Sequence, residues 1–218
     1  MADFAQARQN MVDCQLRTNK LVHPALISQF EEVPRERFVD EAVQSIAYVD
    51  EDVAVGNGRY LVEPMVLARI LQELTIEPTD IVLDVGCGTG YSSAILSGLA
   101  ATVVGLESDP DLAARANDLL TDLAADNAVV VEGVLAEGYA TQGPYDVILV
   151  GGAVAAVPQA LTDQLAEGGR LAAVIDDGSG QGKAILMIKR NGNVSQRVLF
   201  DASVPRLPGF APQEGSVF

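Results

Sequence analysis

The sequence predicts an α/β fold: a doubly wound, mostly parallel, seven-stranded sheet with a C-terminal antiparallel hairpin and an N-terminal helical segment. Three observations predict it. Between residues 81 and 175, short apolar runs alternate with helix-like segments, and apolar runs without polar alternation are typical of parallel strands covered on both faces. Asn191-Gly192 separates two further strand-like runs, which is the strongest short signal for a β-hairpin. Before residue 63, apolar residues repeat at helical spacing instead.

Residues 1–62 are expected to form a unit of helices and one loop that packs on the core, and residues 63–218 the main domain. The first helix has one apolar face, formed by Phe4, Ala7, Met11 and Cys14. A second helix follows Pro24 and stops before Pro34, because proline neither donates a backbone hydrogen bond nor fits in a helix interior. The stretch from Ala47 to Leu61 carries acids and two glycines without helical periodicity, so we expect a long loop there.

The main domain is predicted to consist of repeated strand and helix segments. The expected parallel strands are Ile81–Val85, Thr102–Glu107, Ala128–Glu132, Tyr145–Val150 and Arg170–Ile175. The expected helices begin at Pro64 and span Tyr91–Leu99, Asp111–Ala124 and Pro158–Leu165, the last one ended by Gly168-Gly169. Ala184–Lys189 and Val194–Leu199 are the expected hairpin strands.

Composition excludes several classes of partner. The chain of 218 residues has 14 basic and 30 acidic side chains, and its net charge of −16 repels phosphate backbones and anionic lipids. The longest nearly apolar run, Val147–Val157, is shorter than the roughly 18 to 20 residues that cross a bilayer. We therefore expect neither nucleic-acid nor membrane partners. The first residues include the acid Asp3 and no apolar segment typical of a secretory signal, so we expect a cytoplasmic protein. Two isolated cysteines predict neither a disulfide nor a metal site.

The most informative stretch is the glycine-rich turn after the first expected parallel strand. Gly86, Gly88 and Gly90 are spaced two residues apart, whereas the dinucleotide fingerprint needs its third glycine one residue later. With Asp84 two residues before it, the turn resembles that of proteins that bind S-adenosylmethionine (SAM). Glu107 ends the next strand, where a carboxylate can accept hydrogen bonds from ribose hydroxyls.

Further motifs resemble the protein-L-isoaspartate O-methyltransferase family. They are Met11–Arg17, Val33–Val39, Ala47–Asp50, the turn Asp84–Tyr91, Tyr145–Val150, Val157–Leu161 and Gly168–Leu171, and the likeness covers about residues 9 to 190. The resemblance implies a class I, Rossmann-like methyltransferase that transfers a methyl group from SAM to isoaspartyl carboxylates of damaged proteins, releases S-adenosylhomocysteine and so takes part in protein repair. It places the cofactor against Asp84, Gly86, Cys87, Gly88, Gly90, Glu107, Ser108, Gly133 and Val134.

Two departures from the family pattern concern the acceptor loop and the adenine site. The family usually has Gly-x-Gly-Gln-Thr-Ile-Ser-x-Pro where this chain reads Gly56–Pro64, so Val62 replaces the residue whose hydroxyl lies near the acceptor. The family's Gly-Asp-Gly reads Gly133-Val134-Leu135 here, so its hydrogen bond to adenine must be lost or supplied by Glu132 or Glu137.

The catalytic expectations follow from the acceptor loop. Arg59 is expected to orient an acceptor carboxylate through its two-pronged guanidinium, with Tyr60 as a second donor beside Val62. Two alternatives remain open at this point. The protein could methylate a different acceptor, such as a small carboxylate, or be a degenerate SAM-binding protein. The oligomeric state is left open as well.

Overall fold

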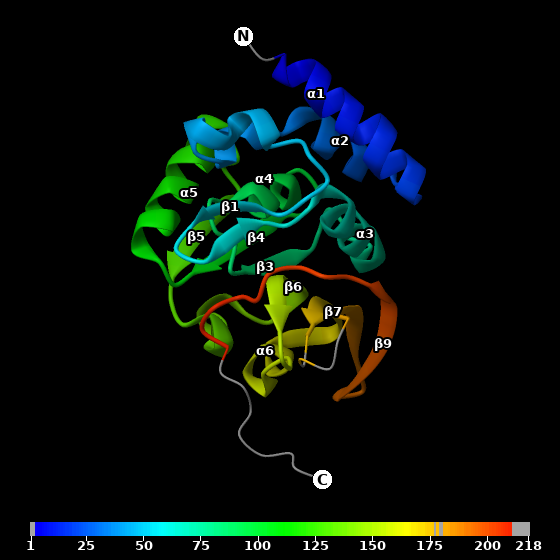
Figure 1. Cartoon of the computed structure of the whole chain (residues 1–218). Coiled ribbons are helices and arrows are strands. Elements are labelled where there is room, and N and C mark those ends of the chain that lie inside the picture. The colour runs from blue at the N-terminus through cyan, green and yellow to red at the C-terminus, as the bar shows by residue number, and fades with distance from the viewer. Residues whose placement is uncertain (1–2, 177, 179–180, 211–218) are drawn as a thin grey trace.

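The computed structural model describes residues 3–176, 178 and 181–210, and its centre is a twisted sheet (Figure 1). In the described part of the chain this sheet has seven strands, in the order β5-β4-β3-β6-β7-β8-β9. The strands are β3 (Ile81–Val85), β4 (Thr102–Glu107), β5 (Ala128–Glu132), β6 (Tyr145–Val154), β7 (Leu165–Ile175), β8 (Lys183–Arg190) and β9 (Asn193–Asp201). The strands from β5 to β7 pair in parallel, and β8 and β9 are antiparallel to their neighbours. The expected sheet and its C-terminal hairpin are confirmed.

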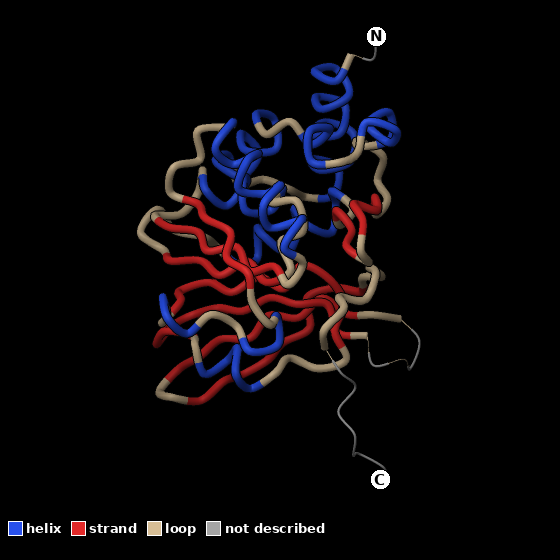
Figure 2. Tube along the Cα trace, turned by 90° about the vertical axis from the view of Figure 1, so that its left-hand side faces the viewer, coloured by secondary structure: helices blue, strands red, loops and turns tan. Residues whose placement is uncertain are grey.

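Helices cover the two faces of the sheet unequally (Figure 2). The thicker layer contains α1 (Phe4–Met11), α2 (Pro24–Glu32), α3 (Pro64–Leu74), α4 (Tyr91–Ser97) and α5 (Pro110–Asp122), whereas α6 (Gln159–Asp163) lies on the other face. Successive residues of a strand point to opposite faces. Accordingly, Val82 belongs to the hydrophobic cluster under the thick layer, and Leu83 and Val85 belong to the cluster under α6. No helix among the described residues is long and apolar enough to span a bilayer.

The apolar face of the first helix differs from the expected one. After α1, the residues Val12–Leu16 form a π-helical turn, which places one more residue in the turn than an α-helix does. The apolar face therefore shifts to Val12 and Leu16, which are both buried, and Cys14 is exposed. The expected burial of Met11 is confirmed, whereas that of Cys14 is wrong.

The stretch from residue 47 to 61, expected to be a long loop, contains a short antiparallel hairpin. Its strands are β1 (Val53–Gly56) and β2 (Arg59–Leu61). Asn57 and Gly58 form the turn with φ values of 49° and 74°, and two such residues in sequence suit the turn type that matches strand twist. Val53 and Val55 point into the core from β1. The expectation of a loop is wrong because Asn57-Gly58 is itself a hairpin signal between short apolar runs.

Two element boundaries in the second half of the sheet also differ from those expected from the sequence. The glycines Gly168-Gly169 lie within β7, where the register with β6 shifts, and α6 already ends at Asp163. Beyond β9, the segment 202–210 crosses the ends of β3 and β6 (Figure 1). There Ala153 exchanges backbone hydrogen bonds with Pro205 and Leu207. The tail after residue 210 lies outside the described residues.

The N-terminal segment shares its hydrophobic cluster with the sheet. Met11, Phe30 and Leu61 belong to the same cluster as Val82 of β3 and Val103 of β4. The division of the chain at residue 62 stays a prediction.

Candidate active site

The glycine turn joins β3 to α4 and has a backbone that side chains would disturb. Gly86, Gly88 and Gly90 have φ values of 74°, 57° and 90°, in the left-handed region that favours glycine. A Cβ atom on Gly86 would lie 2.6 Å from the side chain of Leu207, and one on Gly151 would lie 2.8 Å from the carbonyl oxygen of Gly86. The turn is therefore closely packed between the end of β6 and the C-terminal segment.

Asp84 lies at the base of this turn and is fully buried. Its Oδ2 atom accepts hydrogen bonds from the hydroxyls of Ser92 at 2.6 Å and Ser93 at 2.7 Å, whereas Oδ1 has no partner among the described residues. The pKa of Asp84 is raised to about 6, chiefly by burial and to a smaller extent by the nearby charge of Glu107, with the two serine hydroxyls acting in the opposite direction. A buried carboxylate oxygen without a partner is costly, which suits it to a cationic ligand.

Glu107 ends β4 beside the turn and is also fully buried. It accepts backbone hydrogen bonds from Gly88 at 3.0 Å, Ser108 at 2.7 Å and Asp109 at 3.1 Å. Because β3 and β4 are parallel neighbours, their carboxyl ends bring Asp84 and Glu107 to one edge of the sheet. Ligands of open α/β sheets bind at this edge.

Arg59 contacts Glu107 rather than a free acceptor position. Its Nε atom donates to both oxygens of Glu107 at 3.1 Å, and its Nη2 atom donates to Oε1 and to the Ser108 hydroxyl, each at 2.8 Å. Asn57 fastens the hairpin turn to Asp109, with 2.6 Å between Nδ2 and Oδ2. The hairpin thus directs Arg59 to the end of β4, where the side chain is almost completely buried. In the structure Arg59 is therefore bound to Glu107, and its expected role beside an acceptor carboxylate stays a prediction.

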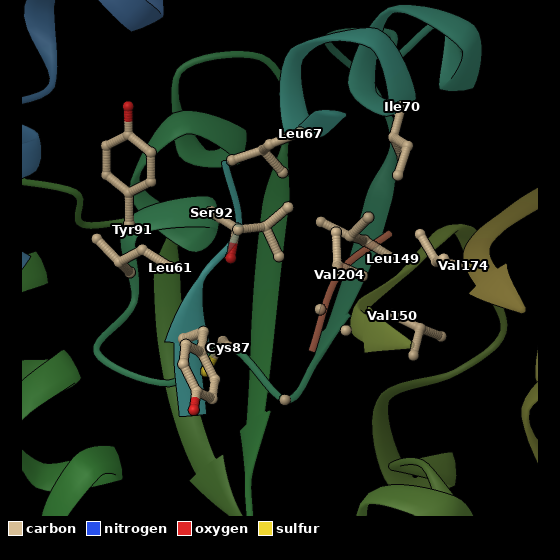
Figure 3. A pocket seen from close by; sticks show the side chains of 15 residues that line it. Leu61, Leu67, Ile70, Cys87, Tyr91, Ser92, Leu149, Val150, Val174 and Val204 are labelled. Carbon is tan, nitrogen blue, oxygen red and sulfur yellow. The ribbon is translucent and has the colours of Figure 1, made fainter. Parts of the chain in front are cut away.

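A narrow apolar cavity of about 30 Å³, partly open to solvent, lies between α3, the glycine turn and the end of β6 (Figure 3). Tyr60 and Val62 line it together with Cys87, so two of the three expected catalytic residues are at the cavity. The side chains of Leu67, Ile70, Ser92, Leu149 and Val150 surround the same space in Figure 3. No charged side chain lines this cavity among the described residues. Burial raises the pKa of Cys87 well above its usual value, so this thiol is not an activated nucleophile.

Gly133 and Val134 follow β5 at the same edge of the sheet. The backbone N–H of Gly133 donates to the carbonyl of Glu107 at 2.9 Å, and Glu107 pairs with Glu132 in the sheet register. Val134 is 55% exposed and does not line the cavity. Its expected place beside adenine stays a prediction.

The structure adds residues that the sequence patterns did not single out. Ser92 and Ser93 hold Asp84, and hydroxyls in the first helical turn after a glycine turn are the signal that could have found them. Glu63 follows Val62, and its backbone N–H donates to Asp52 at 2.9 Å. Burial and, to a smaller extent, the neighbouring acids Asp52, Asp50 and Glu51 together raise the pKa of Glu63 to about 7. The described residues contain no cluster of side chains suited to hold a metal ion.

The glycine turn, the carboxylate at the end of the second parallel strand and the antiparallel closure of the sheet define a class I methyltransferase fold. The family model described as protein-L-isoaspartate(D-aspartate) O-methyltransferase matches residues 6–205, so the chain belongs to that family. This family uses SAM as its methyl donor, and the expectations of fold, family and cofactor are confirmed.

Relatives and solved structures agree with this assignment. The protein-L-isoaspartate O-methyltransferase of Koribacter versatilis is 39% identical over 201 residues, which are 92% of this chain and 90% of the relative. That of Halorhodospira halophila is 37% identical over 207 residues, 94% and 93% of the two chains. A solved protein-L-isoaspartate O-methyltransferase superimposes with a TM-score of 0.82 at 25% identity, covering 93% of this chain and 66% of the other. A candidate protein-L-isoaspartate O-methyltransferase from Plasmodium falciparum, solved in complex with S-adenosyl-L-homocysteine, superimposes with a TM-score of 0.80 at 22% identity. The match covers 96% of this chain and 100% of the other and shows the common fold.

Proposed function

We propose that the protein is a SAM-dependent carboxyl O-methyltransferase that esterifies isoaspartyl residues of damaged proteins. The observation that carries the proposal is the pair of buried carboxylates, Asp84 and Glu107, around the glycine turn and next to an uncharged cavity. The proposed compartment is the cytoplasm, whose reducing conditions suit the free, exposed thiol of Cys14.

The residues around the turn fit the methyl donor. The unpartnered oxygen of Asp84 suits the ammonium group of its amino-acid part, and Glu107 suits its ribose hydroxyls. Gly86, Gly88 and Gly90 allow the backbone to come close to it, and Cys87, Ser108, Gly133 and Val134 complete the proposed cofactor site. The donor supplies an electrophilic methyl group on a sulfonium, which the acceptor oxygen takes as the carbon–sulfur bond breaks.

We assign Arg59 to the cofactor side of the site. Its guanidinium and the ribose hydroxyls would compete for the same lone pairs of Glu107, because Arg59 already donates hydrogen bonds to both carboxylate oxygens. Arg59 can reach an acceptor carboxylate only by leaving Glu107. In this proposal the acceptor is therefore held by Tyr60 and by the loop backbone beside Val62, both at the cavity.

The acceptor needs orientation rather than activation. An isoaspartyl carboxylate is ionised at neutral pH, so the transfer requires no general base. The uncharged lining of the cavity excludes water from around that carboxylate, and the residues that line it orient the carboxylate oxygen toward the methyl group. Membership of the family favours this function over a different acceptor and over a degenerate SAM-binding protein.

The test is methyl transfer from radiolabelled SAM to an isoaspartyl peptide, with the matched aspartyl peptide as the control. We expect base-labile methyl ester on the isoaspartyl peptide and none on the aspartyl peptide. Equal labelling of both peptides, or labelling of neither at saturating SAM, would contradict the proposal.

A further inference from the structure

The motif Val33–Val39 contains a buried cation that the proposed reaction does not use. Arg35 is fully buried, and none of the ion pairs among the described residues involves it. Main-chain carbonyls hold its guanidinium instead. The Nε atom donates to Ala47 at 2.7 Å and the Nη2 atom donates to Val62 at 3.0 Å. Burying a charge without a carboxylate partner is costly, so an arginine at this place indicates a specific role.

The same guanidinium packs against the cofactor turn. Its central carbon lies 4.8 Å from the centroid of the Tyr91 ring, and Tyr91 begins α4 directly after Gly90. The ring of Phe38 meets Tyr91 edge-on at 5.4 Å. In addition, the hydroxyl of Thr89, inside the glycine turn, donates to the carbonyl of Phe38 at 2.7 Å. The turn Arg35–Phe38 is thus attached to the cofactor turn through both of its ends.

Arg35 therefore joins the two halves of the site. One face of its guanidinium stacks on Tyr91 in the cofactor turn, and one edge holds the carbonyl of the acceptor-loop residue Val62. The planar guanidinium does both at once because its donors lie on several nitrogens, whereas a lysine ammonium has all its donors on one nitrogen. We propose that Arg35 is a positioning residue for methyl transfer, which keeps the backbone of residues 61–62 at a fixed distance from the cofactor turn. This inference rests on the proposed function.

In this proposal the acceptor loop can change its side chains and keep its position. Arg35 binds the loop through the carbonyls of Leu61 and Val62, the former at 3.5 Å, and these atoms are present whatever the side chains are. The reaction depends steeply on the distance between acceptor and methyl group, and a misplacement of about 1 Å can cost about a hundredfold in rate. A backbone anchor preserves that distance while position 62 changes from a hydroxyl residue to valine.

The variant Arg35→Lys tests the proposal, with Arg37→Lys as the matched control. Arg37 lies in the same turn, is partly exposed and pairs with Asp122 at 2.7 Å. In Arg35→Lys we expect amide hydrogen exchange of residues 60–63 to become at least tenfold faster. We also expect kcat for the isoaspartyl peptide to fall at least tenfold, while the Kd of S-adenosylhomocysteine changes less than threefold. Arg37→Lys should change none of the three.

A purely structural role gives a different result. Arg35→Lys would then lower the unfolding temperature but leave hydrogen exchange at residues 60–63 and kcat unchanged in the folded protein, which would overturn the proposal. If Arg35→Lys does not fold, Thr89→Val provides the test, because it removes the hydrogen bond from Thr89 to Phe38 that also attaches the turn Arg35–Phe38 to the cofactor turn. It should speed exchange of residues 60–63 about threefold, and unchanged exchange would overturn the proposal. The exchange measurement is independent of activity, whereas failure of the parent protein to methylate the isoaspartyl peptide would contradict the proposed function alone.

Discussion

The cofactor turn, residues 84–92, and the acceptor loop, residues 56–63, adjoin the same cavity but are held in different ways. The turn depends on its own side chains and on glycines, because Asp84 is bound by two serine hydroxyls and Gly88 donates to Glu107. The acceptor loop is held by the side chains of Asn57 and Arg59 at its hairpin turn, but residues 61–63 beside the cavity are held through their backbone, by Arg35 and Asp52. A region held by side chains retains a recognisable sequence pattern, whereas a region held by its backbone can change its side chains and keep its place.

The largest effect is expected where the two regions meet, at Glu107. Glu107→Ala leaves the buried guanidinium of Arg59 without its carboxylate, which should lower the free energy of unfolding by about 3–5 kcal/mol. Loss of the ribose contacts, worth roughly 1.5–3 kcal/mol, should weaken binding of S-adenosylhomocysteine about 10- to 150-fold. Urea denaturation and calorimetry measure the two effects. Exposed Asp126 gives the control Asp126→Ala, and the assignment fails if both variants behave alike.

The second largest effect is a pH dependence at Asp84. Its pKa is about 6 in the folded protein against an ordinary value of 3.8. The unfolded chain therefore loses this proton first as the pH rises, and stability should fall by about 2 kcal/mol between pH 4 and 6. Binding of S-adenosylhomocysteine should change in the opposite direction. Its ammonium group prefers the ionised carboxylate, so its affinity should rise about tenfold from pH 5 to 7.

Asp84→Asn separates these contributions from the titration of other groups. The asparagine has nearly the same shape but no charge at either pH. The variant should bind S-adenosylhomocysteine weakly with a flat profile between pH 5 and 7, and its stability should lack the fall between pH 4 and 6. A profile as steep as that of the parent would assign the pH dependence to another residue.

The difference between the regions also explains how far the sequence predicts the molecule. The glycine spacing and the acids around it identify the cofactor turn because only those residues allow its backbone angles and its buried carboxylates. The apolar runs predict the five parallel strands because strands buried on both faces must be apolar. The π-helical turn after α1 is different, since a single extra residue in a turn has no compositional signal and moves Cys14 out of the core.

The acceptor side is less predictable because its contacts join distant parts of the chain. Arg59 and Glu107 are 48 residues apart, and Arg35 and Val62 are 27 apart. Which carboxylate Arg59 meets depends on the direction of the hairpin β1–β2, and the two strands have only four and three residues. Asn57-Gly58 signals the hairpin but not the direction in which Arg59 points.

A smaller effect is expected at the position where the family has a hydroxyl. Val62→Ser adds one hydrogen-bond donor beside the cavity, worth about 1 kcal/mol, while Arg35 keeps the backbone in place. We expect kcat/KM for the isoaspartyl peptide to rise about three- to tenfold and the affinity for S-adenosylhomocysteine to stay the same. Val62→Ala is the matched control, because it removes the valine without adding a donor and should not raise kcat/KM. An equal rise in both variants would mean that space, not the hydroxyl, limits the acceptor.

The smallest effect concerns charge at the edge of the acceptor loop, where the pKa of Glu63 is about 7. As the pH rises through 7, Glu63 loses its proton and adds a negative charge next to Val62, close to the acids Asp50, Glu51 and Asp52. An isoaspartyl acceptor is itself an anion, so its KM should rise about two- to threefold between pH 6 and 8. The effect is small because Glu63 is partly exposed and salt screens such charges over roughly 8–10 Å. Glu63→Gln should abolish the rise, and about 0.5 M salt should reduce it in the parent. A KM that still rises in Glu63→Gln would show that the repulsion comes from another group and that the charge of Glu63 does not affect the acceptor.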